Sequence, residues 1–524
     1  MRTVTCCICS DLWQGLRHRI RERPVFCTLA FLSWLLWLFL SRNVPYGIDD
    51  WQWGVSAGLE HLKTADLNSR YAGNMLEVIV SRSVVFKTLL MGTMEALIPM
   101  FSVLLVGRWR ETERNAAVDD RFLSLLLILA NLVFLTLPLE VWQQTYGWVA
   151  GFSNYGFAAF LLVISQGFLL DGKNLEKKHS AGYLLLCVLI GFIAQLVLES
   201  LTVFLFPLTL LLVLAQLFAC RRCSAVSVAF LVGAALGATL MFSGRVYSTL
   251  LVTGHTEGVG RQLSFTPDMS LPDILRIFYY RFWYFMPGNL WGNNWLACTV
   301  IALCMIPASK GFGRFLRAAV TGICCCFALF FVLGHFCGPI EKYISRWNEF
   351  YTQWLHILFF LFILVLVFFL FRKQKKLRAA LLLLWLLCPL AISPMLAVTD
   401  MGGRCFLPPI VFLAEFCLLL FGCEAKELHP PVRKTAVAFL SIVLLISCAR
   451  MTAVFSRLGK AERQRETLIA GAREARVSSL YLPDYPYEAY HWITEPLKGG
   501  GQIQYFREFY QIPDEMELLF DPVE

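Results

Sequence analysis

The chain is a succession of apolar segments, each about as long as a membrane-spanning helix. Continuous apolar runs of about 20 residues are typical of transmembrane helices, whereas strands give shorter or alternating runs. The pattern predicts about thirteen such helices, near residues 25–40, 84–107, 122–140, 154–170, 181–199, 201–220, 224–242, 293–309, 318–337, 353–371, 379–398, 406–422 and 435–452. The predicted fold class is therefore an all-α polytopic membrane protein, with a transmembrane domain at 25–452.

The polar segments between these runs alternate in charge, which predicts the orientation of the chain. Four arginines precede the first span, namely Arg17, Arg19, Arg21 and Arg23. Every second loop after that span is also basic, and Lys and Arg gather on the cytoplasmic side of membrane proteins. The N-terminal segment (1–24) is therefore predicted inside. Three regions are predicted outside, namely the first loop (44–83), a large loop (243–292) and the C-terminal tail (453–524).

Two features could change this topology. No small-residue cleavage site follows the first apolar segment, so that segment is interpreted as an anchor and not as a signal peptide. Two predicted spans meet at Glu199-Ser200, where a single re-entrant pair is the alternative. Losing one span there would reverse the later loops and place the basic ones outside, against the charge rule.

Composition supports the membrane assignment and excludes other classes. The chain is 57% hydrophobic and 16% charged, whereas soluble domains carry about 25% charged residues. The net charge of +9 comes from short basic clusters between spans, which favours contact with lipid headgroups and not with nucleic acid. Most of the 18 cysteines lie in apolar runs and are interpreted as small apolar residues. Cys6, Cys7 and Cys9 have no partners at metal-ligand spacing.

Two adjacent carboxylates, Asp49 and Asp50, directly follow the first span and lie beside Trp51 and Trp53. Charge at a membrane boundary is a candidate functional site, although a solvated turn that ends the span is the alternative. A carboxylate can accept the proton of an attacking hydroxyl. The second carboxylate would orient an acceptor or bind a divalent cation. Asp49 is favoured as the base, and the assignment of the two roles stays open.

The segment 66–82 of the first loop is predicted to form an amphipathic helix. One face carries the polar residues Arg70, Asn74, Glu77 and Ser81. A second face, suited to lying on the bilayer, carries Leu67, Tyr71, Met75 and Val78. The polar face is interpreted either as the wet side of an interfacial helix or as part of a cavity shared with the Asp pair. The two interpretations are compatible.

Further candidates lie at the ends of other spans. Arg404 follows two glycines in a turn that enters a span, where a guanidinium can hold a phosphate bidentately. A snorkelling arginine is the alternative. Arg346 is a weaker candidate of the same kind, and Glu199 lies at another membrane end. The tail (453–524) has a charged helical stretch followed by a strand-like run, which predicts a small α/β cap. The sequence contains no phosphate-binding glycine loop, Ser-His-Asp set or zinc spacing.

This combination resembles the GT-C class of membrane glycosyltransferases. The chain is similar to bacterial multi-pass families described as putative glucosyltransferases or as proteins of unknown function. The segments that carry the resemblance are Asp49-Asp50-Trp51, the run 68–74, the turn 403–408 and the run 505–510. They share an acidic pair in the first outer loop, a juxtamembrane helix behind it, about a dozen spans and an outer C-terminal region.

The resemblance implies transfer of a sugar from a polyprenyl-phosphate donor to a glycan or lipid-linked acceptor, usually with inversion. The reaction would occur at the outer face of a bacterial cytoplasmic membrane, with Asp49 or Asp50 as the base. Arg404 or Arg346 would bind the leaving phosphate. The remaining candidate substrate-binding residues are Arg70, Asn74, Glu77 and Glu199. The resemblance implies no definite cofactor; a divalent cation held by the Asp pair stays open, and membrane lipids are expected partners.

Three other functions stay open. A lipid-linked glycan polymerase or ligase would use a large later loop, and the loop 243–292 contains Arg245, His255, Arg261 and Arg281. A transporter or flippase would place ionisable residues or helix breaks near the centre of several spans, whereas charge here gathers at the ends of the apolar runs. A non-enzymatic envelope scaffold would leave the Asp pair without a role.

Overall fold

The computed structural model describes residues 22–114, 118–170, 172–175, 178–253, 263–265, 269–344, 347–399, 401–424, 429–496 and 501–520. Within these residues, ten helical segments are long and apolar enough to cross a membrane, or eleven if a pair bent by 71° forms one span. The architecture is therefore that of an all-helical, multi-pass membrane protein, as the apolar pattern predicts. Most of the N-terminal segment, including Arg17, Arg19 and Arg21, lies outside the described residues.

A helix occupies each of the predicted spans. They are α2 (Pro24–Arg42), α7 (Gly92–Arg114), α8 (Asp120–Leu135), α11 (Phe157–Leu169), α12 (Ala181–Gln195), α13 (Glu199–Cys220), α14 (Ala225–Phe242), α17 (Trp295–Ala308), α18 (Arg314–Cys337), α19 (Glu349–Leu370), α20 (Lys375–Ile392), α21 (Leu407–Glu424) and α22 (Pro430–Ala475). Because α8 and α12 are short and α17 belongs to the bent pair, the count of thirteen remains a prediction.

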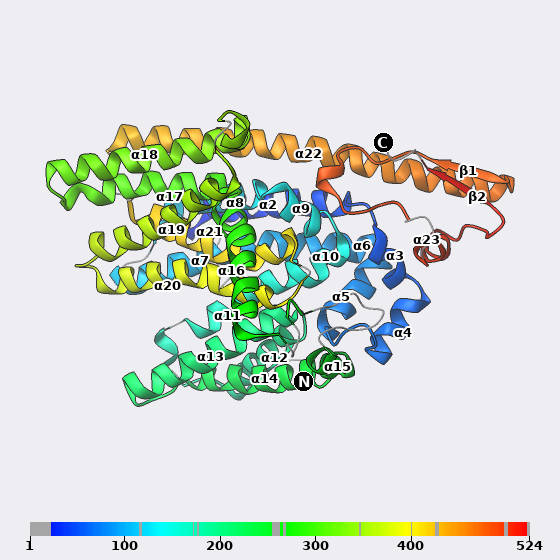
Figure 1. Cartoon of the computed structure of the whole chain (residues 1–524), viewed down its shortest axis with the longest axis horizontal. Helices are drawn as coiled ribbons and strands as arrows, with labels where there is room; N and C mark the ends of the chain where they lie inside the picture. The colour runs from blue at the N-terminus through cyan, green and yellow to red at the C-terminus, as the bar shows by residue number, and fades with distance from the viewer. Residues whose placement is uncertain are drawn as a thin grey trace.

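Several of the basic connections lie together at one end of the bundle. The basic connections α13–α14, α17–α18 and α19–α20 lie at one end of the bundle, on the left in Figure 1. The helices of the first loop lie at the other end, on the right. We refer to this second end as the α3 end. The break near Glu199 falls at residues 196–198, and α13 begins at Glu199.

Helix α21 forms the centre of the bundle. Each of its residues is buried, and it packs against α20, α17, α7, α8 and α11. Its Glu415 accepts a hydrogen bond from the Ser102 hydroxyl at 3.4 Å. In α7, Glu95 is likewise buried and accepts a bond from the Ser41 hydroxyl at 2.6 Å. Ionisable side chains therefore lie inside these two helices as well as at the ends of the apolar runs.

The large loop after α14 is mostly helical. It contains α15 (Arg245–Thr253) and α16 (Leu271–Pro287), and Figure 1 shows α16 lying across the direction of the other helices. Arg281 of α16 donates from Nη2 to the carbonyl oxygens of Met395 and Thr399, at 3.4 and 3.3 Å. It thereby holds the segment after α20 in place. His255 and Arg261 lie outside the described residues.

The first loop folds into α3 (Ile48–Gly54), α4 (Ser56–Thr64), α5 (Tyr71–Ser81) and the short α6 (Val84–Phe86). Helix α5 starts at Tyr71 and not at residue 66, because the Asn68 side chain interrupts the helix. Its Oδ1 accepts from the Arg70 backbone N–H and from the Asn74 side chain, both at 2.9 Å. Arg70 is therefore the N-cap residue of α5.

The faces of α5 also differ from the predicted ones. Asn74, Glu77 and Ser81 are buried, so the interpretation of this side as water-facing is wrong. Val78, predicted to face the bilayer, is buried too, whereas Met75 and Ile79 are exposed. Asn74 and Oε2 of Glu77 are bonded to Asn68 and Asn154, whereas Oε1 of Glu77 and the Ser81 hydroxyl are buried without a hydrogen-bond partner among the described residues.

The C-terminal region combines helix and strand. The C-terminal part of α22 is followed by β1 (Ser479–Leu482), the one-turn helix η9 (Glu488–Tyr490), α23 (Gln502–Tyr510) and β2 (Glu517–Phe520). Strands β1 and β2 pair in parallel, with Ser479 opposite Glu517. Helix α23 packs on α3, where the rings of Phe506 and Trp51 lie 4.8 Å apart. The tail therefore contacts the helix that carries the Asp pair.

Candidate functional site

Asp50 is a fully buried carboxylate held by two backbone N–H groups. Its Oδ2 accepts from Gly47 and its Oδ1 from Ala150, both at 2.7 Å. Ala150 lies in the first turn of α10 (Val149–Gly151), which continues into α11, and a carboxylate is favourable at a helix N-terminus. Burial raises the pKa of Asp50 to about 7, although both backbone bonds lower it. Asp50 therefore joins α3 to the start of this span.

Asp49 precedes it but is only partly buried. Among the described residues, none donates a hydrogen bond to its carboxylate. Burial raises the pKa of Asp49 to about 6, and the positive charge of Arg404 counteracts this rise. A carboxylate with a pKa near 6 is largely ionised at neutral pH yet basic enough to accept a proton in a reaction. The two neighbouring carboxylates thus have different environments.

Arg404 lies in the one-turn helix η8 (Gly403–Phe406), which precedes α21. Its Nε donates to the Tyr155 hydroxyl at 3.2 Å. The backbone N–H of Arg404 donates to Oε1 of Gln144 at 3.3 Å, and that of Gly403 donates to Oε1 of Glu140 at 3.0 Å. Side chains of α9 (Leu139–Gln144) therefore fix the turn that carries the guanidinium.

A second arginine lies on the other side of Tyr155. Arg70 faces Glu199, with its Nε and Nη2 each 2.7 Å from Oε2. The Tyr247 hydroxyl donates to the other oxygen of Glu199 at 2.6 Å. The Nη1 group of Arg70 makes no hydrogen bond within the described residues. Arg70 and Arg404 both lie close enough to Tyr155 to interact with it electrostatically, so the two positive charges belong to one cluster.

Glu77 lies behind the Asp pair. Its pKa is raised well above the usual range by burial, and by the negative charges of Asp49 and Asp50. Its Oε2 accepts from the Asn154 side chain at 3.4 Å. On the same helix, the Asn74 side chain donates to Oδ1 of Asn68 at 2.9 Å.

A cavity of about 330 Å³ adjoins the arginine cluster. Its polar end is formed by Arg70, Tyr155, Glu199, Ser200 and Tyr247. The rest of its wall is apolar and comes from α13, α14, α15 and the segments near 263 and 394–398, namely Leu198, Val203, Phe242, Leu250, Leu263, Pro394, Met395, Ala397 and Val398. Val203, one turn into α13, is 49% exposed, so the apolar part of the cavity is open beside a membrane-spanning helix.

The structure brings most of the predicted residues together. Asp49, Asp50 and Arg404 do not line the 330 Å³ cavity; Tyr155, which contacts Arg404, connects them to it. Arg346 lies outside the described residues. Among the described residues, no three His, Cys, Asp or Glu side chains form a group that could hold a metal ion. Each oxygen of Asp50 accepts one hydrogen bond from a backbone N–H group.

Three residues of the cluster could not be recognised in the sequence. Tyr155 and Tyr247 lie in or beside apolar runs, and Gln144 lies in a short polar stretch without a motif. Tyrosine and glutamine are ordinary near membrane boundaries, so neither their type nor their spacing distinguishes them. Each of these residues is more than 45 positions along the chain from the charged residue that it contacts, so the contact arises only when the helices pack.

Comparisons with known protein families, with curated proteins and with solved structures found no match for this chain.

Proposed function

We propose that the protein is a membrane glycosyltransferase that takes a sugar from a polyprenyl-phosphate donor. The observation that carries this proposal is the amphiphilic cavity, whose polar end holds the Arg70–Glu199 ion pair and Tyr155. Tyr155 accepts a hydrogen bond from Arg404, whose charge acts on the partly exposed Asp49. A lipid-linked phosphate needs both an apolar channel open to the membrane and positive groups at one end. Among the described residues, the Arg70–Tyr155–Arg404 cluster and the exposed Val203 offer this combination.

In the proposed reaction, Asp49 accepts the proton of the acceptor hydroxyl as its oxygen attacks the anomeric carbon. The bond between that carbon and the phosphate oxygen breaks, and polyprenyl phosphate leaves with the electron pair. Arg70 and Arg404 stabilise the negative charge that develops on the phosphate, because fixed cations act strongly in a site of low dielectric. Asp50 holds α3, and thus Asp49, against the start of the Val149–Leu169 span.

The charge pattern supports a location for this site. The α3 end lies opposite the basic connections, and basic loops favour the cytoplasm. We place the Asp pair and the tail on the outer face of a bacterial cytoplasmic membrane, where lipid-linked sugars and glycan or lipid-linked acceptors would meet.

A transporter is the second candidate, and buried Glu95 and Glu415 favour it. Ionisable groups inside spans are expensive and often mark ion or substrate pathways. Each accepts a hydrogen bond from a serine of a neighbouring helix, which also suits a structural role. Release of the sugar from its lipid distinguishes an enzyme from a flippase, because a flippase moves the intact donor across the bilayer.

Filling the cavity tests the proposed donor site. Tryptophan in place of Val203 would obstruct the apolar opening, and we expect the Val203→Trp variant to consume donor about tenfold more slowly, from the loss of roughly 1.4 kcal/mol of transition-state binding. Purified protein in nanodiscs is given polyprenyl-phosphate hexoses labelled in the sugar, with an envelope glycan fraction as acceptor, and the label leaving the lipid is measured.

The matched control is Val232→Trp, which changes an equally exposed valine on α14 that does not line the cavity. Equal rates of donor consumption by the two variants would contradict the assignment of this cavity as the donor-binding site. Transfer of intact donor across the bilayer without release of the sugar would overturn the glycosyltransferase proposal.

The reaction should also lose rate in acid. A base is active when ionised, so kcat/KM is expected to fall as the pH drops through about 6, the pKa to which burial raises Asp49. Because the charge of Arg404 lowers this pKa, an Arg404→Gln variant should show the same fall at higher pH. The pH–rate profiles of wild type, Arg404→Gln and the control Arg473→Gln, at an exposed site on α22, check this. An unchanged profile in Arg404→Gln would contradict the assignment of Asp49.

A further inference from the structure

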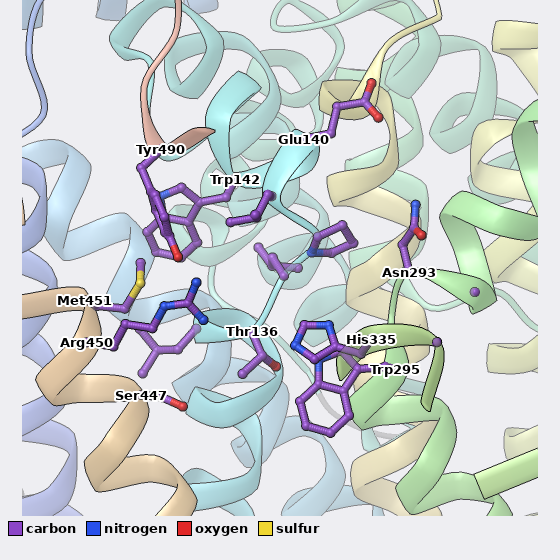
Figure 2. A pocket seen from close by; sticks show the side chains of 16 residues that line it. Thr136, Glu140, Trp142, Asn293, Trp295, His335, Ser447, Arg450, Met451 and Tyr490 are labelled. Atoms are coloured by element: carbon purple, nitrogen blue, oxygen red, sulfur yellow. The ribbon is translucent and has the colours of Figure 1, made fainter. Parts of the chain in front are cut away.

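A second cavity, of about 410 Å³, lies where α17 begins and α18 ends. Figure 2 shows it between α22 on one side and α17 and α18 on the other, with the α8–α9 connection between them. None of its lining residues lines the 330 Å³ cavity of the proposed donor site. The proposed transfer reaction does not involve this second cavity.

The polar groups of the second cavity are mainly hydrogen-bond donors. Arg450 of α22 extends toward the space in Figure 2, and its guanidinium lies 5.7 Å from the centre of the Tyr490 ring. Across the cavity, the His335 ring stacks on Trp295 with centroids 4.6 Å apart. Thr136 lies between these two sides, with its hydroxyl donating to the Leu132 carbonyl at 2.7 Å, so the available donors are those of Arg450, Tyr490 and His335. Such a set suits an anion held by a guanidinium and neutral donors.

Only one carboxylate, Glu140, is among the lining residues, and it is turned away from Arg450. Figure 2 shows the Glu140 side chain directed to the far edge of the cavity. Its Oε1 accepts from the backbone N–H of Gly403 at 3.0 Å and from the Gln144 side chain at 3.4 Å. Glu140 is therefore bonded to the η8 turn and does not neutralise Arg450. The positive charge of Arg450 faces the cavity.

The surroundings indicate which source the anion has. Ile446 and Leu333, which directly precede the lining residues Ser447 and Gly334, are 64% and 47% exposed. Both belong to helices long and apolar enough to cross a membrane. The cavity thus continues onto apolar surfaces of α18 and α22 at the boundary of the membrane. A soluble anion would make no favourable contact with these apolar surfaces, whereas the acyl chains of a lipid would pack against them.

We propose that this cavity binds the phosphate headgroup of an anionic membrane phospholipid. Arg450 contacts the phosphate, Tyr490 supplies a hydroxyl group, and the acyl chains lie against the exposed apolar residues of α18 and α22. The site is independent of the proposed transfer reaction, since it shares no residue with the proposed catalytic cluster or donor cavity.

Lipid binding is tested with the full-length protein in nanodiscs that contain phosphatidylcholine and a small fraction of phosphatidylglycerol. After release from the nanodiscs, native mass spectrometry measures which lipid stays bound. We expect wild type to retain phosphatidylglycerol selectively, and Arg450→Gln to retain it about tenfold less, because a charge-assisted hydrogen bond is lost. Arg450→Lys, which keeps the charge but loses the forked geometry, should fall between them.

The matched control is Arg473→Gln, which removes the same charge from an exposed position on α22 outside the cavity. Equal phosphatidylglycerol retention by Arg450→Gln and Arg473→Gln would overturn the proposal. Inorganic phosphate provides the second arm: displacement of the lipid by phosphate alone at millimolar concentration would show a soluble-anion site and likewise overturn it. Because Arg450 is exposed, its variants are expected to fold, which size-exclusion chromatography checks.

Discussion

Replacing Asp49 by Asn is expected to lower sugar transfer by about 10²- to 10⁴-fold, the usual contribution of a general base. The amide cannot accept the proton of the acceptor hydroxyl. Since no described residue donates a hydrogen bond to the Asp49 carboxylate, the substitution breaks no hydrogen bond, and the thermal unfolding temperature should change little. Release of labelled sugar from the donor and thermal unfolding of the same preparation measure both effects.

Asp50→Asn should mainly lower the stability of the protein, whereas Asp49→Asn should mainly lower its activity. This contrast distinguishes the two carboxylates. Both oxygens of Asp50 accept from backbone N–H groups, and an Asn side chain presents one NH₂ group in their place. A donor facing a buried donor costs about 1–3 kcal/mol, so this variant should unfold at a lower temperature. Any loss of activity should then follow displacement of α3.

Glu60→Gln, at an exposed position on α4, is the control for both variants because it removes a carboxylate from the same loop. Full transfer activity in Asp49→Asn would contradict its role as base. Equal destabilisation of Asp49→Asn and Asp50→Asn would contradict the division of roles. Both comparisons require that the variants insert into the membrane at the wild-type level. The yield of protein extracted by detergent measures this.

The apolar pattern was sufficient to locate the helices, because a helix that crosses a membrane needs a long run of apolar residues whatever its neighbours are. It could not show which helix is central. Helix α21 is buried along its whole length, whereas α13 is largely exposed, yet the two read alike in the sequence. Lipid tails are as apolar as a protein interior, so hydropathy does not separate a lipid-facing helix from a buried one.

The candidate site was predictable where charge is conspicuous and not where its partners are ordinary. Asp49, Arg70, Glu199 and Arg404 stand out beside apolar runs. Their connection through Tyr155 depends on how the helices pack. The start of α5 was misplaced for a local reason: the Asn68 side chain bonds two groups at its N-terminus, and such side-chain bonds compete with helix formation.

The second large effect concerns the contact between the tail and the turn that follows α9. The backbone of the tail passes directly over Gly147. An added Cβ at this position would lie 2.1 Å from the carbonyl oxygen of Tyr490. Two backbone hydrogen bonds hold the same segment. The Ile48 N–H donates to the Ile493 carbonyl at 2.9 Å, and the Trp492 N–H donates to the Gly147 carbonyl at 3.3 Å. The tail therefore joins α3 and the α9–α10 turn through its main chain.

We expect Gly147→Ala to destabilise the protein by about 3 kcal/mol, at the upper end of the cost of overpacking, because the obstructing atom is backbone and cannot rotate away. The control is Gly471→Ala on α22, where an added Cβ meets nothing within 4 Å; there alanine should stabilise the helix by about 0.5–1 kcal/mol. Thermal unfolding in nanodiscs, followed by tryptophan fluorescence, measures both.

The contact also links stability to the site, since the tail segment that crosses Gly147 bonds the first residue of α3. Displacement of this segment in Gly147→Ala should therefore expose Trp492, which stacks on Trp148 with centroids 5.5 Å apart, and loosen α3 together with Asp49. Iodide quenching of tryptophan fluorescence should rise in Gly147→Ala and not in Gly471→Ala. Equal quenching and equal unfolding temperatures would show that the tail does not hold α3 in place.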